Sequence, residues 1–186
     1  MSKENGEAEA KPEAEGAGAP SLNILAQYIK DLSFENPQAP NAAPAQDGGP
    51  DVDIRINVNG RHLKDDDYEV SLHFKVETKS GDTTSFIVEL LYGAVFRIQN
   101  VPEQDLRPVL LIEAPRQIFP FARRILADVT RDGGFPPLLL DPINFVALYQ
   151  QNEAAAQQAN TDIAQDAAQD TAQNGANEAE EKKPDA

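Results

Sequence analysis

Four stretches of the chain alternate large apolar with polar residues, and this alternation restricts the fold more than any other feature of the sequence. The stretches are residues 28–35, 52–59, 68–77 and 83–98. Because successive side chains of a β-strand point to opposite faces, the alternation predicts a sheet with one covered face and one exposed face. Such a sheet favours antiparallel pairing. The triplet Ser80-Gly81-Asp82 predicts a hairpin turn between the last two strands.

The residue order within the first stretch predicts which side chains share a face. We expect one face to carry Tyr28, Lys30, Leu32 and Phe34, and the opposite face to carry Ile29, Asp31, Ser33 and Glu35. The segment 36–50 is too rich in Pro and Gly for a strand and predicts a long loop. Gly93, inside the fourth stretch, predicts a bulge or kink.

After Val101-Pro102 the apolar residues are spaced by three and four, which is typical of a helix. Pro115 suits the first helical position, and four apolar residues follow it at helical spacing: Ile118, Phe121, Ile125 and Val129. Gly133-Gly134 predicts the end of this helix. Asp141-Pro142 predicts the start of a second helix that extends through Tyr149. Strands followed by helices predict an α+β fold, a four-stranded antiparallel sheet with helices packed on one face.

Charge and composition divide the chain into three parts. The formal net charge is −15, from 31 Asp and Glu against 16 Lys and Arg. Residues 1–21 hold five acids and two lysines, and residues 151–186 hold eight acids and two lysines. All 4 Tyr and 8 Phe lie between Tyr28 and Tyr149. We interpret 1–21 as a disordered acidic N-terminal tail, 22–150 as the folded domain, and 151–186 as a low-complexity acidic tail that is partly helical at its start.

The composition also excludes several classes of function. The chain has no Cys, so it forms no disulfide, no thiolate zinc site and no Cys nucleophile. Its acidity argues against binding nucleic acid or an anionic membrane surface. The sequence shows no signal peptide and no apolar run of about 18 residues. We therefore expect a cytoplasmic protein without direct membrane insertion.

No catalytic pattern stands out in the sequence. It lacks a Gly-rich phosphate loop, a His-Glu-x-x-His pair and a Gly-x-Ser-x-Gly elbow. We interpret His62 and His73 as exposed histidines without partners. Asp65-Asp66-Asp67 is interpreted as a solvated turn, because it lacks the ligand spacing and the Gly of a calcium loop. The sequence thus predicts no metal, no cofactor and no enzymatic activity.

Two groups of apolar residues exceed what a plain globular domain needs. On the face of the fourth stretch that should be polar, Ile87 and Leu91 flank Glu89. This pattern indicates a partner-binding patch, an acidic surface with isolated apolar residues, or a subunit interface. In the last third, Val109–Ile112 and Leu138–Leu140 add apolar surface, and the predicted helix is apolar on more than one side. This excess indicates either homo-oligomerisation or a larger monomer core.

Two longer motifs resemble the signatures of one known family. The first is Asp31-Leu32-Ser33-Phe34-Glu35-Asn36-Pro37-Gln38-Ala39-Pro40. The second comprises Phe119-Pro120-Phe121-Ala122-Arg123 and the run from Gly134 to Phe145. The chain between about residues 24 and 150 resembles the SecB family of protein-export chaperones. The resemblance implies a homotetramer, assembled as a dimer of dimers, that binds unfolded preproteins without ATP or cofactor and delivers them to the SecA translocation ATPase.

The resemblance also implies two sets of binding residues. The SecA contact would fall on Asp31, Glu35, Ile87 and Glu89. A long apolar groove for the unfolded client would include Val52, Ile54, Ile56, Phe135 and Tyr149. For the three residues of the second stretch, core packing is an equally weighted alternative.

Two other functions remain open from the sequence. A SecB-like chaperone can be dedicated to a toxin–antitoxin system, although the acidic and aliphatic SecA patch argues against that client. A small enzymatic or ligand-binding α+β domain would instead show a deep pocket with converging polar groups, whereas a chaperone predicts a long, shallow apolar groove.

Overall fold

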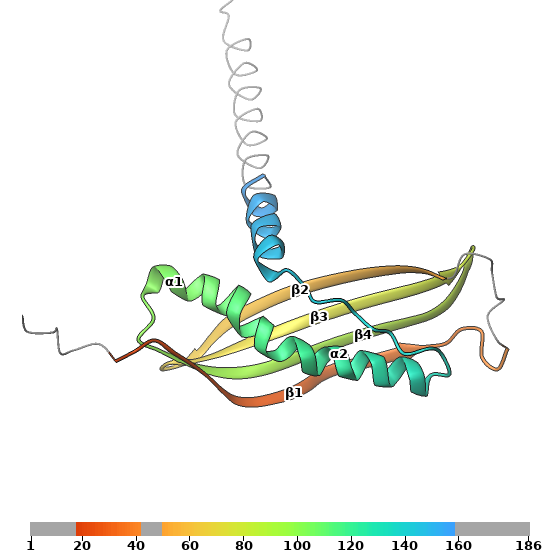
Figure 1. The fold of residues 1–186 in the computed structure, drawn as a ribbon, viewed down its shortest axis with the longest axis horizontal. Coiled ribbons are helices and arrows are strands. Elements are labelled where there is room, and N and C mark those ends of the chain that lie inside the picture. Colours follow the sequence, from red (N-terminus) through yellow and green to blue (C-terminus); the bar gives the residue numbers. More distant parts are fainter. Residues whose placement is uncertain (1–17, 42–49, 159–186) are drawn as a thin grey trace, which may run out of the picture.

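The computed structural model describes residues 18–41 and 50–158. Four strands are followed by three consecutive helical segments (Figure 1), namely β1 (Ser21–Glu35), β2 (Asp51–Lys64), β3 (Asp67–Ser80), β4 (Thr83–Gln99), α1 (Glu103–Pro108), the π-helical η1 (Val109–Glu113) and α2 (Ala114–Asp132). A further helix occupies residues 145–158.

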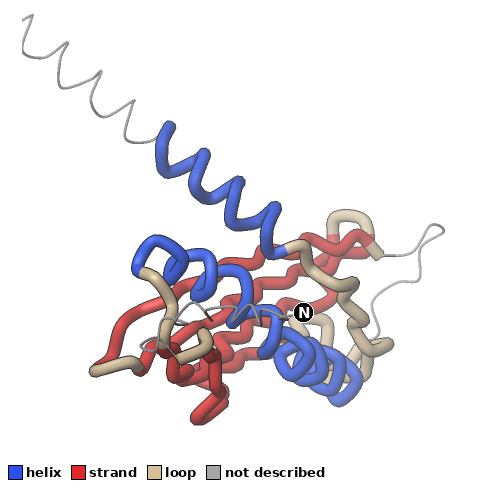
Figure 2. Tube along the Cα trace, turned by 60° about the vertical axis from the view of Figure 1, so that its left-hand side comes forward, coloured by secondary structure: helices blue, strands red, loops and turns tan. Residues whose placement is uncertain are grey.

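The strands form one antiparallel sheet in the order β1-β4-β3-β2, so that β1 and β2 are the edge strands. Gly81, with φ 61°, turns β3 into β4 as the hairpin triplet predicts. Figures 1 and 2 show the helices on one side of the sheet, with α2 lying across it. The chain returns over the same face through residues 133–144, and the last helix projects away from the sheet beside β2. The α+β prediction of a four-stranded sheet with helices on one face is confirmed.

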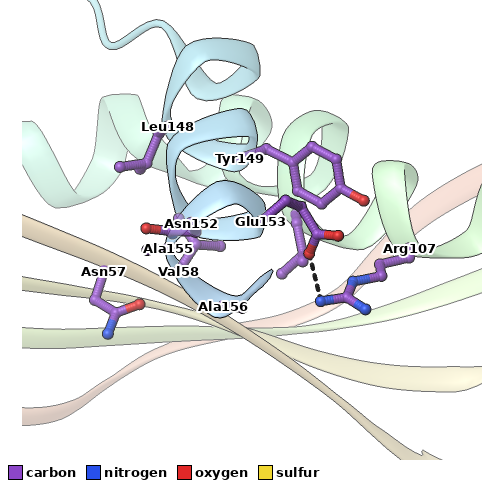
Figure 3. A pocket seen from close by; sticks show the side chains of 10 residues that line it. Asn57, Val58, Arg107, Leu148, Tyr149, Asn152, Glu153, Ala155 and Ala156 are labelled. Atoms are coloured by element: carbon purple, nitrogen blue, oxygen red, sulfur yellow. Dashed lines mark hydrogen bonds and ion pairs between the residues drawn. The ribbon is translucent and has the colours of Figure 1, made fainter. Parts of the chain in front are cut away.

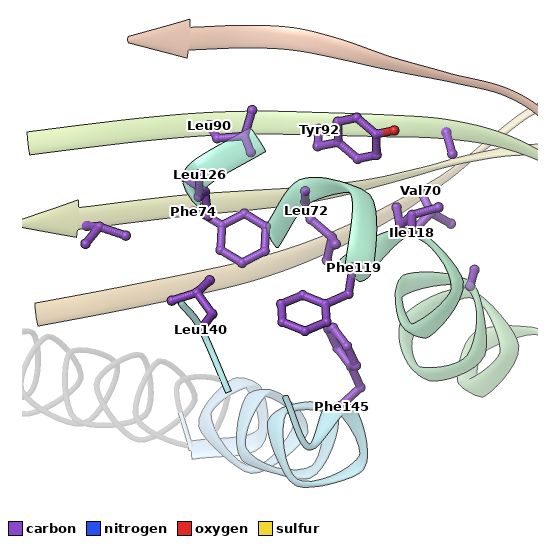
Figure 4. Packing of buried hydrophobic residues seen from close by; sticks show 14 of the residues in the cluster. Val70, Leu72, Phe74, Leu90, Tyr92, Ile118, Phe119, Leu126, Leu140 and Phe145 are labelled. Atoms are coloured by element: carbon purple, nitrogen blue, oxygen red, sulfur yellow. The ribbon is translucent and has the colours of Figure 1, made fainter. Parts of the chain in front are cut away.

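The core lies between the two central strands and α2. Its most deeply buried apolar side chains are Val70, Leu72, Phe74, Val76, Val88, Leu90, Ala94, Phe96, Ile118, Ala122 and Leu126. The ring of Phe119 lies between Phe74 and Phe145, at centroid distances of 6.3 and 6.0 Å. Figure 4 shows Leu140 and Phe145 pointing toward this cluster, so the returning segment and the last helix share one core with the sheet.

The face prediction for β1 is wrong in part, because the strand contains two irregularities that sequence alternation does not reveal. The register shifts between Ile24 and Ala26 and again between Ile29 and Asp31. Ile29 pairs with Tyr92 on the helix side, whereas Asp31 pairs with Leu91 on the outer face. Tyr28 therefore shares the outer face with Asp31, Ser33 and Glu35, while Ile29, Leu32 and Phe34 share the helix side. No register shift occurs at Gly93, so of the predicted bulge or kink the bulge is wrong.

The chain becomes helical directly after Val101-Pro102, as predicted, and Pro115 lies in the first turn of α2, as predicted. The backbone stays helical from Glu103 to Asp132, and the amide of Ala114 donates to the carbonyl of Val109 in the wider π pattern. Proline donates no amide hydrogen bond, and the π turn adjusts the bonding just before Pro115. Pro115 thus marks the start of α2, although the chain is already helical before it.

The second helix begins later than Asp141-Pro142 predicts. Its first residue is Phe145, and the side-chain Oδ1 of Asn144 accepts a hydrogen bond from the amide of Ala147 at 3.1 Å. Asn144 is thus the N-cap. Leu140 and Phe145 are both buried, so the residues between them continue the return across the sheet.

Candidate apolar groove and acidic outer face

The helix-side face of β2 carries a strip of apolar residues at the edge of the sheet. Val52, Ile54 and Ile56 pair with Thr78, Val76 and Phe74 of β3, which are all buried. Val52 and Ile54 remain 37% and 39% exposed, whereas Ile56 packs against the core. Large apolar side chains on the core-facing side of an edge strand are thus left partly open to solvent.

One end of this strip lies beside an aromatic cluster. Val52 pairs with Thr78, which pairs with Phe86. The ring of Phe135 lies 4.8 Å from that of Phe86 and 6.3 Å from that of Phe34. A Cβ atom on Gly133 would lie 2.2 Å from the ring of Phe34. The turn that precedes Phe135 therefore packs directly against this cluster.

The returning segment is held in place by Thr130 at the end of α2. Thr130 is fully buried. Its hydroxyl donates to the carbonyl of Leu126 at 2.9 Å and accepts the amide hydrogen of Leu138 at 2.9 Å. Its backbone carbonyl accepts from the amide of Phe135 at 3.1 Å. These bonds fix the position of Phe135 relative to the sheet.

The other end of the strip opens into a shallow hollow of about 370 Å³. Val58 lies on the same face as Val52 and Ile54 and lines this hollow together with Leu111, Leu148 and Tyr149. Arg107 of α1 and Glu153 of the last helix form an ion pair of 2.5 Å at its rim (Figure 3). A neighbouring hollow of about 400 Å³ continues along Val58, Gly60 and η1.

The five predicted groove residues are therefore arranged along one side of the molecule, although they do not form one cluster. Phe135 lies at one end, Tyr149 lies at the other, and the strip of β2 connects them. The two hollows are open and their linings mix apolar with polar side chains, whereas a small enzyme would need a deep pocket of converging polar groups.

The four predicted partner-binding residues lie together on the outer face. Asp31 pairs with Leu91, Ser33 with Glu89, and Glu35 with Ile87. Asp31 and Glu35 are exposed, and Ile87 and Glu89 are half-buried. We refer to Asp31, Glu35, Ile87, Glu89 and Leu91 as the acidic–aliphatic surface.

Glu89 has two basic neighbours that the sequence analysis did not identify. His73 Nε2 lies 2.6 Å from Glu89 Oε1, and Lys75 Nζ lies 4.0 Å from Oε2. His62 also has a partner, since its Nε2 lies 2.8 Å from the carbonyl oxygen of Asp65. The interpretation of both histidines as lacking partners is wrong, because strand pairing and turn geometry bring acceptors to them.

The acidic turn is likewise not wholly solvated. Asp67 is buried and binds Arg97 through two hydrogen bonds of 2.8 and 3.1 Å. These bonds hold the pKa of Asp67 below its usual range. Within the described residues, no group of three or more His, Cys, Asp or Glu could hold a metal ion.

Glu69 is the functional candidate that sequence reasoning missed. It is 4% exposed on the outer face of β3. Tyr28 Oη donates to its carboxylate at 2.5 Å, Lys30 Nζ lies 3.0 Å away, and Arg61 Nε donates to the second oxygen. Burial raises the pKa of Glu69, but these three partners outweigh it and bring the value to about 2. Burial and the hydrogen bond to Glu69 raise the pKa of Tyr28 to about 12.

An α+β sheet with an open apolar groove on one face and exposed acidic and aliphatic side chains on the other is typical of a protein that binds other proteins. The chain matches the family model described as preprotein translocase subunit SecB over residues 15–156. It therefore belongs to the SecB family, and the predictions of a protein-export chaperone and of no enzymatic activity are confirmed.

Relatives and a solved structure agree with this assignment. The protein-export protein SecB of Bradyrhizobium sp. is 55% identical over 153 residues, which cover 81% of this chain and 93% of the relative. The SecB of Parvibaculum lavamentivorans is 53% identical over 146 residues, which cover 78% of this chain and 87% of the relative. A SecB-like chaperone of Mycobacterium tuberculosis, solved with an antitoxin peptide, shares the fold at a TM-score of 0.55 and 14% identity, covering 66% of this chain and 90% of that one. Among the described residues, no helix is both long and apolar enough to cross a membrane.

Proposed function

We propose that this protein binds unfolded preproteins along the β2 strip, keeps them competent for translocation, and passes them to SecA at the acidic–aliphatic surface. The observation that supports the client site best is the exposure of Val52 and Ile54 on the face of the sheet that elsewhere forms the core. Burial of apolar area is non-directional, so such a strip can accept many unfolded sequences.

The proposed groove runs from Phe135, past Val52 and Ile54, to the hollow beside Tyr149. β2 is an edge strand within the described sheet. An extended client lying along it can add main-chain hydrogen bonds to the apolar contacts. Bonds of this kind do not depend on the sequence of the client, which suits a holding chaperone.

The proposed SecA site combines charge with apolar contact. Asp31 and Glu35 are exposed and attract a basic partner surface, which speeds encounter. Ile87 and Leu91 lie beside them in the register and supply apolar area for the bound state. The surface faces away from α2 and the groove, so client and ATPase can bind at the same time.

We further propose that the chain forms a cytoplasmic homotetramer, a dimer of dimers, with helices between the sheets. Ile29, Leu32 and Phe121 support this arrangement, because they are 46%, 38% and 47% exposed on the helix side of the fold. Sedimentation equilibrium tests it, and a monomer at micromolar concentration would contradict it.

A holding assay tests the function. Excess protein should delay the refolding of an unfolded preprotein in the absence of ATP, and unhindered refolding would contradict the proposal. The double substitution Val52→Ser, Ile54→Ser should weaken holding by about tenfold, because half-buried aliphatic side chains lose their contact with the client. The matched control Asp53→Ser, Arg55→Ser changes the opposite face of the same strand, and holding should be unchanged.

Export clients are favoured over a toxin–antitoxin client by the relatives above 50% identity, which are named protein-export proteins.

A further inference from the structure

On the outer face, Glu69 and its three partners Tyr28, Lys30 and Arg61 form a cluster that joins the two edge strands. Tyr28 and Lys30 belong to β1, Arg61 belongs to β2, and Glu69 itself belongs to β3. Arg61 pairs directly with Glu69 in the register. The two β1 side chains must instead pass over the whole of β4 to reach the carboxylate.

Gly93 makes this crossing possible. It pairs with Tyr28 on one side and with Ser71 on the other. A Cβ atom at this position would lie 2.9 Å from Tyr28 Cε2 and 3.2 Å from Lys30 Cδ. Any larger residue would push both side chains away from Glu69, so the glycine serves a close approach of side chains and not a turn.

Tyr28 and Lys30 lie at the register shift that sets the orientation of the rest of β1. The shift lies between Ile29 and Asp31, so Lys30 is the additional residue. A one-residue change of register moves every following side chain to the other face of a sheet. Without the shift at Lys30, Asp31 and Glu35 would point toward the helices and Phe34 would point outward.

We propose that Glu69, together with Tyr28, Lys30 and Gly93, positions the acidic–aliphatic surface by fixing the bulge at Lys30. The cluster does not belong to that surface, since the register places it nearer the opposite end of the sheet from Glu35 and Ile87. It acts through the backbone of β1, which carries Asp31 and Glu35. This inference rests on the SecA contact proposed above.

The substitution Lys30→Met tests the inference, with Lys79→Met as a control of equal charge. Both remove one positive charge from the outer face, but Lys79 binds Glu77 and not Glu69. On charge alone, both variants should bind a basic partner more tightly. If Lys30 positions the bulge, Lys30→Met should instead weaken SecA binding by about tenfold, while Lys79→Met should not weaken it. Gly93→Ala changes no charge and should weaken binding in the same way.

Amide hydrogen exchange of residues 29–33 in the free protein provides the second measurement. Faster exchange in Lys30→Met, together with weaker SecA binding, supports the inference. Unchanged exchange, or faster exchange with unchanged affinity, overturns it. The variant Glu89→Lys distinguishes an error in the bulge inference from an error in the proposed SecA site. If the SecA site is correct, Glu89→Lys should weaken SecA binding even when Lys30→Met does not. If neither variant weakens binding, the proposed SecA site is itself wrong.

Discussion

The two faces of the sheet bury side chains by different means. On the helix side, large apolar side chains pack together. The proposed groove is the part of this face where the apolar side chains, Val52 and Ile54, stay partly exposed. On the outer face, Glu69 and Asp67 are almost as deeply buried, but each is covered by the charged side chains that bind it.

This difference determines how each face should respond to substitution. Apolar burial depends on area and tolerates changes of shape, so the groove should lose affinity gradually. A charge network depends on the position of each donor, so the outer face should respond sharply to a change in one group. The predictions below test this contrast, in order of decreasing effect.

Glu69→Gln should lower the free energy of unfolding by about 2–3 kcal/mol at pH 7, because Tyr28, Lys30 and Arg61 lose a charged acceptor. The pKa of Glu69 is depressed from 4.5 in the unfolded chain to about 2 in the fold. Its stabilising contribution is therefore complete above pH 4.5 and is lost as pH falls toward 2. Urea unfolding at fixed protein concentration should show the difference between wild type and variant shrinking over that range.

The alkaline side gives a complementary test of the same cluster. The pKa of Tyr28 is raised from 10 to about 12, so its contribution is complete below pH 10 and is lost as pH rises toward 12. Tyr28→Phe should remove this alkaline loss.

A stability difference between Glu69→Gln and wild type that stays constant from pH 7 to pH 3 would contradict the account of Glu69 as an ionised, bound carboxylate.

Glu89→Lys should weaken SecA binding by about thirtyfold, equivalent to roughly 2 kcal/mol, because it reverses the charge at the centre of the acidic–aliphatic surface. Titration calorimetry measures the affinity. The oligomeric state and client holding should not change, since the residue faces away from the groove. A loss of oligomerisation would instead assign Glu89 to a subunit contact.

The alternation in the sequence predicts most of β2, β3 and β4 well, because the register is regular from Val52 to Val58, from Tyr68 to Glu77 and from Phe86 to Arg97. It fails in β1, where one additional residue at Lys30 reverses the faces without changing the composition of the strand. Asp31, Ser33 and Glu35 were nevertheless placed together correctly, because all three follow the bulge. Tyr28 and Ile29, which precede it, were both assigned to the wrong side.

The polar partners could not be predicted because they depend on register between distant strands. His73 and Glu89, or Tyr28 and Glu69, become neighbours only once the sheet is assembled. One signal was available in the sequence. A glycine inside a strand marks a bulge or a close approach, and Gly93 marks the approach of Tyr28 and Lys30.

Thr130→Val should cost about 1–2 kcal/mol, because the buried amide of Leu138 loses its acceptor while the side-chain volume is retained. Exchange of the Leu138 and Phe135 amides should become faster. Thr130→Ser keeps the hydroxyl and should retain slow exchange. Thr84→Val removes a hydroxyl that donates to Glu77 on the less buried hairpin, and its effect should stay within about 0.5 kcal/mol. Equal costs at the two threonines would mean that Thr130 does not anchor the returning segment.

Ile54→Ser should have the smallest effect, about a threefold loss of client holding, because Ile54 is already 39% exposed and gains only part of its burial from a client. A refolding-delay titration against several unfolded preproteins measures this loss. The reduction should be similar for each client, since apolar contact is non-directional. A loss confined to one client would show that the groove recognises particular side chains of that client. The groove would then respond to single substitutions as sharply as the outer face, which would contradict the contrast between the two faces.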